Sequence, residues 1–315
     1  MVPGEMRAIA VNEWGGADKL ELVDVEPPPV APDGVLVRVR AASLNPVDYK
    51  VREGKLAGAF PHHFPVILGW DAAGVVERAG PAVTWFRPGD AVYGYCRRQD
   101  LQYGTYGEFT TVPEGFLAHM PPELSFEEAA ALPLASLTAH QSLERLGLRG
   151  GETLFVTGGA GGVGHIAVQL GVARGARVIA SGSPDNHGFL RDLGAEPVDY
   201  HDPDLPARVR QMTDGGVDAA FDLFGGEAQE HAFAVLRRGG RLVSIAAPPE
   251  RREHIESGYV FVRPSGYDLG EHITPLVHEG ALRPHVSGTY PLESVAEAMA
   301  RLEQGHVRGK LVLTI

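Results

Sequence analysis

The amino-acid sequence predicts an α/β protein with a doubly wound parallel sheet and a second domain made mostly of short strands. Strand and helix patterns alternate from about residue 151 to residue 245, which is the order of a parallel sheet with crossover helices. A Gly-x-Gly-x-x-Gly turn, residues 159–164, follows the first of those strands. Residues 6–112 instead contain short strands broken by Gly and Pro, which is typical of a small, partly closed β-barrel.

Composition limits the classes of function. The 315 residues are 44% hydrophobic and 22% charged, enough for a normal core, and the net charge of -12 argues against a nucleic-acid surface. The single cysteine, Cys96, excludes internal disulfides and a cysteine-rich metal lobe. No run approaches 18 apolar residues, and the N-terminus does not resemble a signal peptide. We therefore expect a cytoplasmic protein with no membrane partner.

The first domain is predicted over residues 1–125. Proline and glycine turns, such as those at residues 27–29 and 88–90, separate its strands. The strands are expected at residues 7–11, 20–25, 35–41, 66–76, 91–95 and 107–112.

The second domain is predicted over residues 126–274. Ser125-Phe-Glu-Glu is typical of a capping box at the start of a helix, and a second helix is expected from Thr138 to Leu146. A final strand at 259–263 would lie at the edge of the sheet, where pairing with a second subunit would cover it. Residues 275–315 are predicted to return to the first domain. The other strands of this domain are expected at residues 152–157, 177–180, 197–200, 217–222 and 241–245.

The glycine turn predicts a dinucleotide site. Gly159 permits the tight turn, Gly161 lets a pyrophosphate approach bare backbone, and Gly164 lets helix and strand pack closely. Gly162 and Val163 complete the turn before the positive end of the helix dipole. The helix that follows is expected to lay one apolar face on the sheet, formed by Val163, Ile166, Ala167 and Leu170.

Several segments resemble one family in order and spacing. They are Ala41-Ala-Ser-Leu-Asn-Pro-Val-Asp, Ile67-Leu-Gly-Trp-Asp-Ala-Ala-Gly, Leu132-Pro-Leu-Ala-Ser-Leu-Thr-Ala, Gly158-Gly-Ala-Gly-Gly-Val-Gly and Phe221-Asp-Leu-Phe-Gly-Gly. Over nearly its whole length the chain is similar to the zinc-independent quinone oxidoreductases of the medium-chain dehydrogenase/reductase superfamily. The resemblance implies a GroES-like catalytic domain beside a Rossmann domain. It also implies NADPH-dependent reduction of quinones or α,β-unsaturated carbonyls, usually by a homodimer.

The residues at the zinc positions predict that no metal binds. Zinc members of the superfamily place a cysteine near Asn45 and a His-Glu pair near Trp70 and Asp71. Carboxamide and indole do not supply the ligands that zinc requires. His62 and His63 lie in a proline-flanked loop without partners at ligand spacing.

The end of the second strand of the dinucleotide unit favours NADPH over NADH. NAD enzymes usually place an acidic residue there, whereas this chain has Ser181 and Ser183 around a glycine. Relatives often carry a lysine a few residues on, where this chain has Asn186 and His187. Tyr200 matches a tyrosine that lies near the adenosine in the family, although a rim aromatic would explain it equally well.

The other candidate residues are expected at the cleft between the domains. Asn45 matches an asparagine beside the nicotinamide and could polarise a carbonyl, although an Asx turn before Pro46 is the alternative. Asp48 is a catalytic-loop candidate, expected to hold the loop through hydrogen bonds. Thr138 is a cofactor candidate or a helix N-cap. Two further cofactor candidates, Phe224 and Ile245, lie at the carboxyl ends of strands of the second domain, and the resemblance implies a third, Arg263, which aligns with a cofactor-contacting arginine of the family.

Catalysis without a metal would depend mostly on placement of the hydride donor and on donors for the developing enolate oxygen. No residue stands out as the proton donor, and Tyr49, Tyr93, Tyr95 and water remain candidates. The alternative functions are an enoyl-thioester reductase and a cofactor-binding protein with little turnover.

Overall fold

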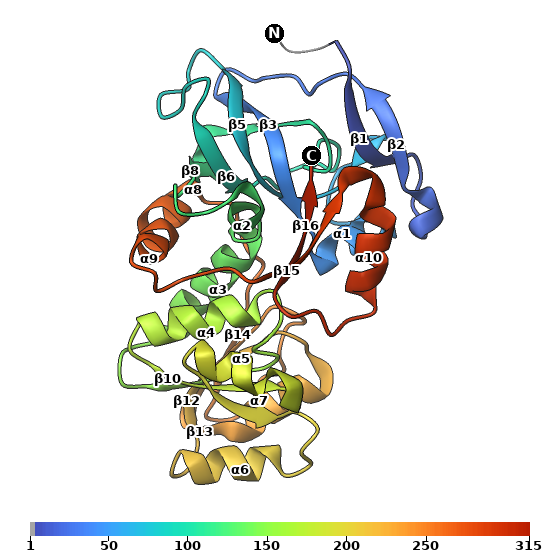
Figure 1. The fold of residues 1–315 in the computed structure, drawn as a ribbon. Helices are drawn as coiled ribbons and strands as arrows, with labels where there is room; N and C mark the ends of the chain where they lie inside the picture. Colours follow the sequence, from blue (N-terminus) through green and yellow to red (C-terminus); the bar gives the residue numbers. More distant parts are fainter. Residues whose placement is uncertain (1–3) are drawn as a thin grey trace. The chain divides into compact units, whose positions relative to one another are not determined.

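The computed structural model describes residues 4–315, and the chain divides into two compact units (Figure 1). Among the described residues, the first unit contains residues 4–134, Pro264–His278 and Pro284–Ile315. The second contains Ala135–Arg263 and Glu279–Arg283. The sequence predicts boundaries after residues 125 and 274. Within residues 4–315, no helix is both long and apolar enough to cross a membrane.

The first unit is built from two sheets in which all strand pairs except β15 with β16 are antiparallel. A seven-stranded sheet has the order β15-β16-β3-β5-β6-β8, with β7 also paired to β3, and a three-stranded sheet has the order β2-β1-β4. The strands are β1 (Met6–Val11), β2 (Glu21–Val25), β3 (Gly34–Ser43), β4 (Val66–Ile67), β5 (Asp71–Ala79), β6 (Ala91–Tyr95), β7 (Phe109–Pro113), β8 (Leu117–His119), β15 (Val286–Pro291) and β16 (Lys310–Thr314). The helices are α1 (Pro46–Arg52), α2 (Phe126–Ala130), α8 (Gly266–Asp268), α9 (Thr274–His278) and α10 (Val295–Glu303).

The end of the chain is part of this first unit. Strand β16 pairs antiparallel with β3, with Val312 opposite Ser43, and it pairs in parallel with β15 (Figure 1). Residues 310–313 are buried, so the strand is almost entirely inside the unit. Consequently Lys310 enters the interior beside the start of α1.

The second unit holds one six-stranded sheet, in which every pair of neighbouring strands is parallel, in the order β11-β10-β9-β12-β13-β14. The chain winds outward from β9 in one direction and then from β12 in the other, so right-handed crossovers place helices on both faces. The strands are β9 (Thr153–Val156), β10 (Arg177–Gly182), β11 (Glu196–Asp199), β12 (Val217–Asp222), β13 (Leu236–Ser244) and β14 (Glu256–Tyr259). The helices are α4 (Gly164–Ala173), α5 (His187–Asp192), α6 (Leu205–Met212) and α7 (Gly226–Val235), and α3 (Pro133–Leu146) begins at the division between the units.

The doubly wound parallel sheet and the first unit, which is rich in β-strands and matches a GroES-like domain, confirm the predicted fold class. The predicted edge strand at 259–263 is wrong in position, because β13 ends at Ser244, which pairs with Tyr259, and leaves the following residues without a partner strand. Helix α3 begins at Pro133, five residues before the predicted start. The capping box at Ser125 is confirmed, since its hydroxyl accepts from Glu128 N at 3.2 Å.

Helix α4 differs from the expected one-faced helix. It is buried on nearly all sides from Gly164 to Gly171. The short segment Glu279–Arg283 covers part of it, because the Gln169 amide donates to Arg283 O at 3.0 Å and accepts from Arg283 N at 2.9 Å.

Candidate functional site

The glycine-rich turn between β9 and α4 is tightly packed at two positions and open at one. A Cβ on Gly159 would lie 2.7 Å from Ala180 Cβ, and one on Gly164 would collide with the carbonyl oxygen of Gly158. A Cβ on Gly161 would meet nothing closer than Gly158 O at 3.4 Å. The packing of the protein therefore explains the first and third glycines but not the second, which fits backbone kept bare for a ligand.

This turn lies at the switch point of the sheet, where the carboxyl ends of β9 and β12 adjoin. The loop after β12 is held by the buried carboxylate of Asp222. Its Oδ1 accepts from Phe224 N at 3.1 Å and Gly225 N at 3.0 Å, and its Oδ2 accepts from the Ser244 hydroxyl at 2.7 Å. The Phe224 ring lies against Gly158 and is 67% exposed. Asp222 thus holds an apolar ring beside the glycine turn.

Ser181 and Ser183 have different surroundings. Ser181 is buried within β10, and its hydroxyl accepts from Gly158 N at 3.0 Å, so it supports the glycine turn. Ser183 follows the strand, is partly exposed, and accepts from the Asn186 amide at 3.0 Å. The exposed side chain at the end of this strand is therefore Ser183. Tyr200 lies directly after β11, is 36% exposed, and its ring packs on His201.

Thr138 lies in the interior of α3, so the N-cap explanation is wrong. Its hydroxyl is buried and has no hydrogen-bond partner among residues 4–315, which leaves it available to a ligand. Ile245 follows β13 and is partly exposed. The backbone of Arg263 is held by Gln141, which donates to Arg263 O at 3.0 Å and accepts from Arg263 N at 3.1 Å, and the Arg263 side chain is exposed.

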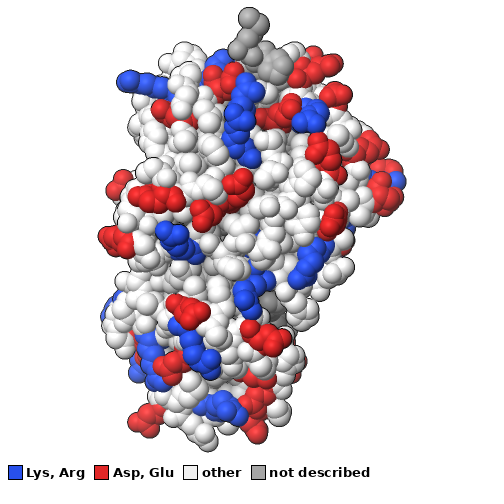
Figure 2. All heavy atoms as spheres, in the orientation of Figure 1, with Lys and Arg blue, Asp and Glu red and all other residues white. Residues whose placement is uncertain are grey.

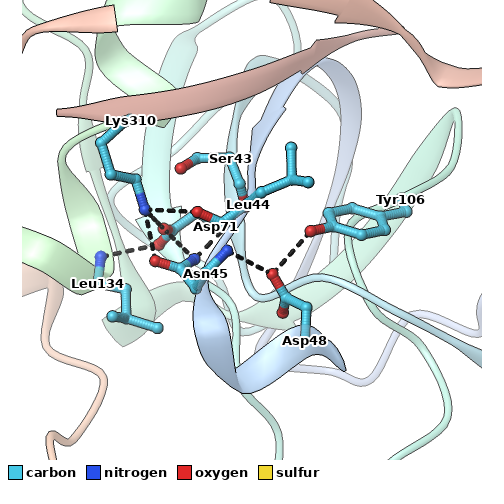
Figure 3. Close-up of polar contacts among 8 residues, drawn as sticks. All are labelled: Ser43, Leu44, Asn45, Asp48, Asp71, Tyr106, Leu134 and Lys310. Carbon is cyan, nitrogen blue, oxygen red and sulfur yellow. Dashed lines mark hydrogen bonds and ion pairs between the residues drawn. The ribbon is translucent and has the colours of Figure 1, made fainter. Parts of the chain in front are cut away.

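Asn45 is the centre of a buried polar cluster in the first unit (Figure 3). Its amide nitrogen donates to Asp71 Oδ2 at 2.8 Å, and its amide oxygen accepts from Lys310 Nζ at 2.5 Å. Asp71 Oδ1 in turn accepts from Leu134 N at 2.7 Å, near the start of α3. Asn45 is also the N-cap residue of α1, where it forms a capping box with Asp48.

Asp48 closes the other side of this cluster. Its Oδ2 accepts from Asn45 N and from the Tyr106 hydroxyl, both at 2.7 Å, which holds the loop as expected from the sequence. Its Oδ1 is buried without a partner among residues 4–315. Burial raises the pKa of Asp48 to about 7, although the hydrogen bonds from Tyr106 and Asn45 oppose the shift.

Two of the tyrosines considered as proton donors are fully buried. The Tyr93 hydroxyl lies 2.9 Å from Thr274 Oγ1, and the Tyr95 hydroxyl accepts from Arg97 Nε at 3.1 Å. Burial raises the pKa of both hydroxyls, although the Thr274 and Arg97 contacts oppose the shift. A higher pKa makes each hydroxyl a weaker acid than a solvent-exposed tyrosine.

Two protein-family models match parts of this chain, and relatives of known name match nearly all of it. Residues 31–122 match the alcohol dehydrogenase GroES-like domain, and residues 193–313 match a family described as zinc-binding dehydrogenase. The 2-methylene-furan-3-one reductase of Solanum lycopersicum is 35% identical, over 99% of this chain and 80% of that protein. The same identity and coverage hold for the NADPH-dependent alkenal/one oxidoreductase of Arabidopsis thaliana chloroplasts.

Comparison with solved structures also finds proteins of this kind. The quinone oxidoreductase from Coxiella burnetii is 33% identical with a TM-score of 0.87, and the alignment covers 99% of each chain. The chain belongs to the quinone oxidoreductase family of the medium-chain dehydrogenase/reductase superfamily. The resemblance seen in the sequence is confirmed. The structure of a mycobacterial protein complexed with NADPH is 28% identical with a TM-score of 0.88, and the alignment covers 98% of this chain and 100% of that one.

The description zinc-binding dehydrogenase does not fit the side chains around Asn45. Three positions of this chain correspond to zinc ligands in the zinc members of the superfamily. At these positions Asn45 offers an amide, Trp70 an indole and Asp71 a carboxylate. That carboxylate already accepts from Leu134 N and from the Asn45 amide. Zinc requires at least three good ligands, so this quinone oxidoreductase has no donor set for the metal at that place.

Sequence reasoning missed three residues in these networks. Lys310 and Tyr106 were not candidates, because their partners are distant in the sequence. Asp222 was not a candidate either, although two of its partners, Phe224 and Gly225, lie close by in the sequence. Lys310 carried the clearest signal, since it is the only charged residue of the final strand and is followed by three apolar residues. A buried lysine is uncommon unless it is paired.

Proposed function

We propose that this protein is an NADPH-dependent, zinc-independent reductase of quinones or α,β-unsaturated carbonyls. The coarser activity, an NAD(P)H-dependent quinone or enone oxidoreductase, follows from its family. The observation that carries the proposal is the glycine turn at the switch point of the parallel sheet, with Gly161 open to a ligand.

Residues of the second unit would hold the cofactor. The backbone of residues 159–164 offers N–H groups to a pyrophosphate at the start of α4. Ser181 fixes Gly158, and Thr138 offers a buried hydroxyl without a partner among residues 4–315. Phe224, Ile245, Tyr200 and Arg263 are the further proposed contacts. When bound, NADPH supplies a hydride to an electron-poor carbon.

In the first unit, Asn45 is the proposed donor to the oxygen on which negative charge develops, and Asp48 holds the loop that carries it. One amide hydrogen of Asn45 donates to Asp71, and the second makes a long contact of 3.4 Å with Ser43 O. A substrate oxygen would replace Ser43 O as the acceptor of the second hydrogen, because that bond is the longer of the two.

The preference for NADPH is proposed from the end of β10. Ser183 and Asn186 present uncharged hydrogen-bonding groups there, whereas an acidic residue would repel a 2′-phosphate. An NADPH-dependent relative and a similar structure complexed with NADPH support this choice.

A homodimer and a cytoplasmic location are also proposed. Strand β14 is at the edge of the sheet, with Tyr259 and Phe261 exposed at 40% and 49%, and a second subunit pairing there would cover both rings. On the face drawn in Figure 2, basic and acidic side chains are interspersed without a continuous basic surface, which supports a small-molecule partner. Light scattering of the purified protein would test the dimer.

The test of the function is cofactor oxidation at 340 nm with a panel of quinones and enones, with a chelator present and NADPH and NADH compared. We expect NADPH consumption with at least one acceptor class. Tight NADPH binding with no turnover of any acceptor would favour the cofactor-binding alternative. Turnover restricted to enoyl thioesters would favour the thioester reductase.

A further inference from the structure

Lys310 is a buried cation with no part in the functions described so far. Its side chain is 4% exposed, and Nζ lies 2.9 Å from Leu44 O, 2.5 Å from Asn45 Oδ1 and 3.8 Å from Asp71 Oδ2 (Figure 3). An ammonium group is costly to bury unless oxygens replace its water. Here three oxygens, two on the loop before α1 and one on β5, surround the ammonium group in place of water. The site therefore stabilises a positive charge at this position.

The two neighbours of the Asn45 side chain determine which way its amide points. An ammonium group can only donate a hydrogen bond, and an ionised carboxylate can only accept one. Lys310 lies at the amide oxygen and Asp71 at the amide nitrogen. The flipped amide would place NH₂ against the ammonium and oxygen against the carboxylate, so both contacts would become repulsive.

The arrangement requires an ionised Asp71 and a protonated Lys310, and burial and neighbouring charge act on the pKa of each. Burial raises the pKa of Asp71 to about 6, opposed by Lys310 and by the hydrogen bonds from Asn45 and Leu134, so the carboxylate is mainly ionised at pH 7. Burial lowers the pKa of Lys310 from its usual value, and the negative charges of Asp71 and Asp48 oppose that shift. The opposite charges support each other across the Asn45 amide.

We propose that Lys310 is a positioning residue that fixes the orientation of the Asn45 amide, with the amide oxygen toward the ammonium group and the amide nitrogen toward Asp71 and Ser43 O. The C-terminal strand thereby decides that Asn45 offers a hydrogen-bond donor rather than an acceptor to the substrate oxygen. This inference rests on the proposed function of Asn45, but the orientation of the amide is measurable without any substrate.

The chain has three asparagines, Asn12, Asn45 and Asn186, so ¹⁵N labelling of asparagine alone gives three side-chain NH₂ groups in an NMR spectrum. The signal that disappears in the Asn45→Ala variant is assigned to the Asn45 NH₂ group. In the wild type, we expect the Asn45 NH₂ to exchange with solvent on the order of 100-fold more slowly than that of exposed Asn12. Equal exchange rates would mean that the amide is not held, and would overturn the proposal without any change at Lys310.

Lys310→Met removes the charge while keeping the length of the side chain. It should shift the Asn45 resonances and speed their exchange at least about tenfold, whereas Lys55→Met, at an exposed lysine, should leave them unchanged. If Lys310→Met does not fold, Lys310→Gln is used in its place. The glutamine amide can both donate and accept a hydrogen bond, so it permits both orientations of the Asn45 amide. Unchanged Asn45 resonances in a folded, neutral variant would overturn the proposal.

Kinetics separate positioning from a merely structural role. Lys310→Met should lower kcat without changing KM for NADPH, and should add no further loss of kcat in an Asn45→Ala background. Losses that multiply in the double variant would show that Lys310 does not act through Asn45. Wild-type kcat in Asn45→Ala would refute the proposed donor role of Asn45, and the NMR measurement would still decide the orientation.

Discussion

The Gly161→Ala variant tests whether position 161 requires a glycine for cofactor binding or for the stability of the fold. The new methyl carbon would lie 3.4 Å from Gly158 O, an ordinary contact distance, and Gly161 does not have a positive φ. The free energy of unfolding without cofactor should therefore change by less than about 1 kcal/mol.

Cofactor binding should respond differently to the same methyl group. It would stand where a pyrophosphate oxygen accepts a hydrogen bond from the backbone of the turn. Loss of one hydrogen bond to a charged group costs about 1.5–3 kcal/mol. Because about 1.4 kcal/mol is a factor of ten, the Kd for NADPH should rise about 10- to 100-fold.

The assay combines calorimetric titration with NADPH and thermal unfolding without it. Gly115→Ala is the matched control, since a Cβ there meets no atom within 4 Å in the first unit. Gly164→Ala is the opposite case, because its Cβ would collide with the Gly158 carbonyl and lower the melting temperature in the absence of cofactor. A folded Gly161→Ala protein that binds NADPH as tightly as the wild type would refute the reasoning.

Three further predictions concern charge. Because burial raises the pKa of Asp48 from 3.8 to about 7, its contribution to stability is full below pH 3.8 and is lost as pH rises through 7. Asp48→Asn should flatten this part of the pH dependence in thermal unfolding between pH 4 and 8, and curves parallel to the wild type would contradict it. Ser183→Asp should move the kcat/KM ratio on the order of tenfold toward NADH by repelling the 2′-phosphate, and an unchanged ratio would mean that this phosphate binds elsewhere. Dialysis against a chelator should leave turnover unchanged, with no stoichiometric zinc in elemental analysis; loss of activity restored by zinc would show a metal site.

Features that depend on neighbours in the sequence could be predicted from the sequence. The turn at residues 159–164 follows a strand and precedes a helix, and the Ser125 capping box lies within four residues. Boundaries were less predictable, because they depend on partner strands. The edge strand β14 ends at Tyr259 only because β13 ends beside it at Ser244.

The environment of the site residues could not be read from the chain. Ser181 and Ser183 are two residues apart and chemically identical, yet one supports the glycine turn and the other lies partly exposed. Thr138 was expected to open a helix, and only the structure shows its hydroxyl buried in the interior of α3 without a partner among residues 4–315.

The sequence by itself determined the parallel nucleotide-binding sheet, the family and the unsuitability of Asn45 and Trp70 as zinc ligands. Each follows from residue types at short spacing, where local geometry restricts the outcome. The tertiary structure alone decided the cluster around Asn45, because its contact with Lys310 spans 265 residues of chain. Sheet pairing of β16 with β3 brings that lysine into the interior, and burial then gives its charge an influence on Asn45 that it would not have in water.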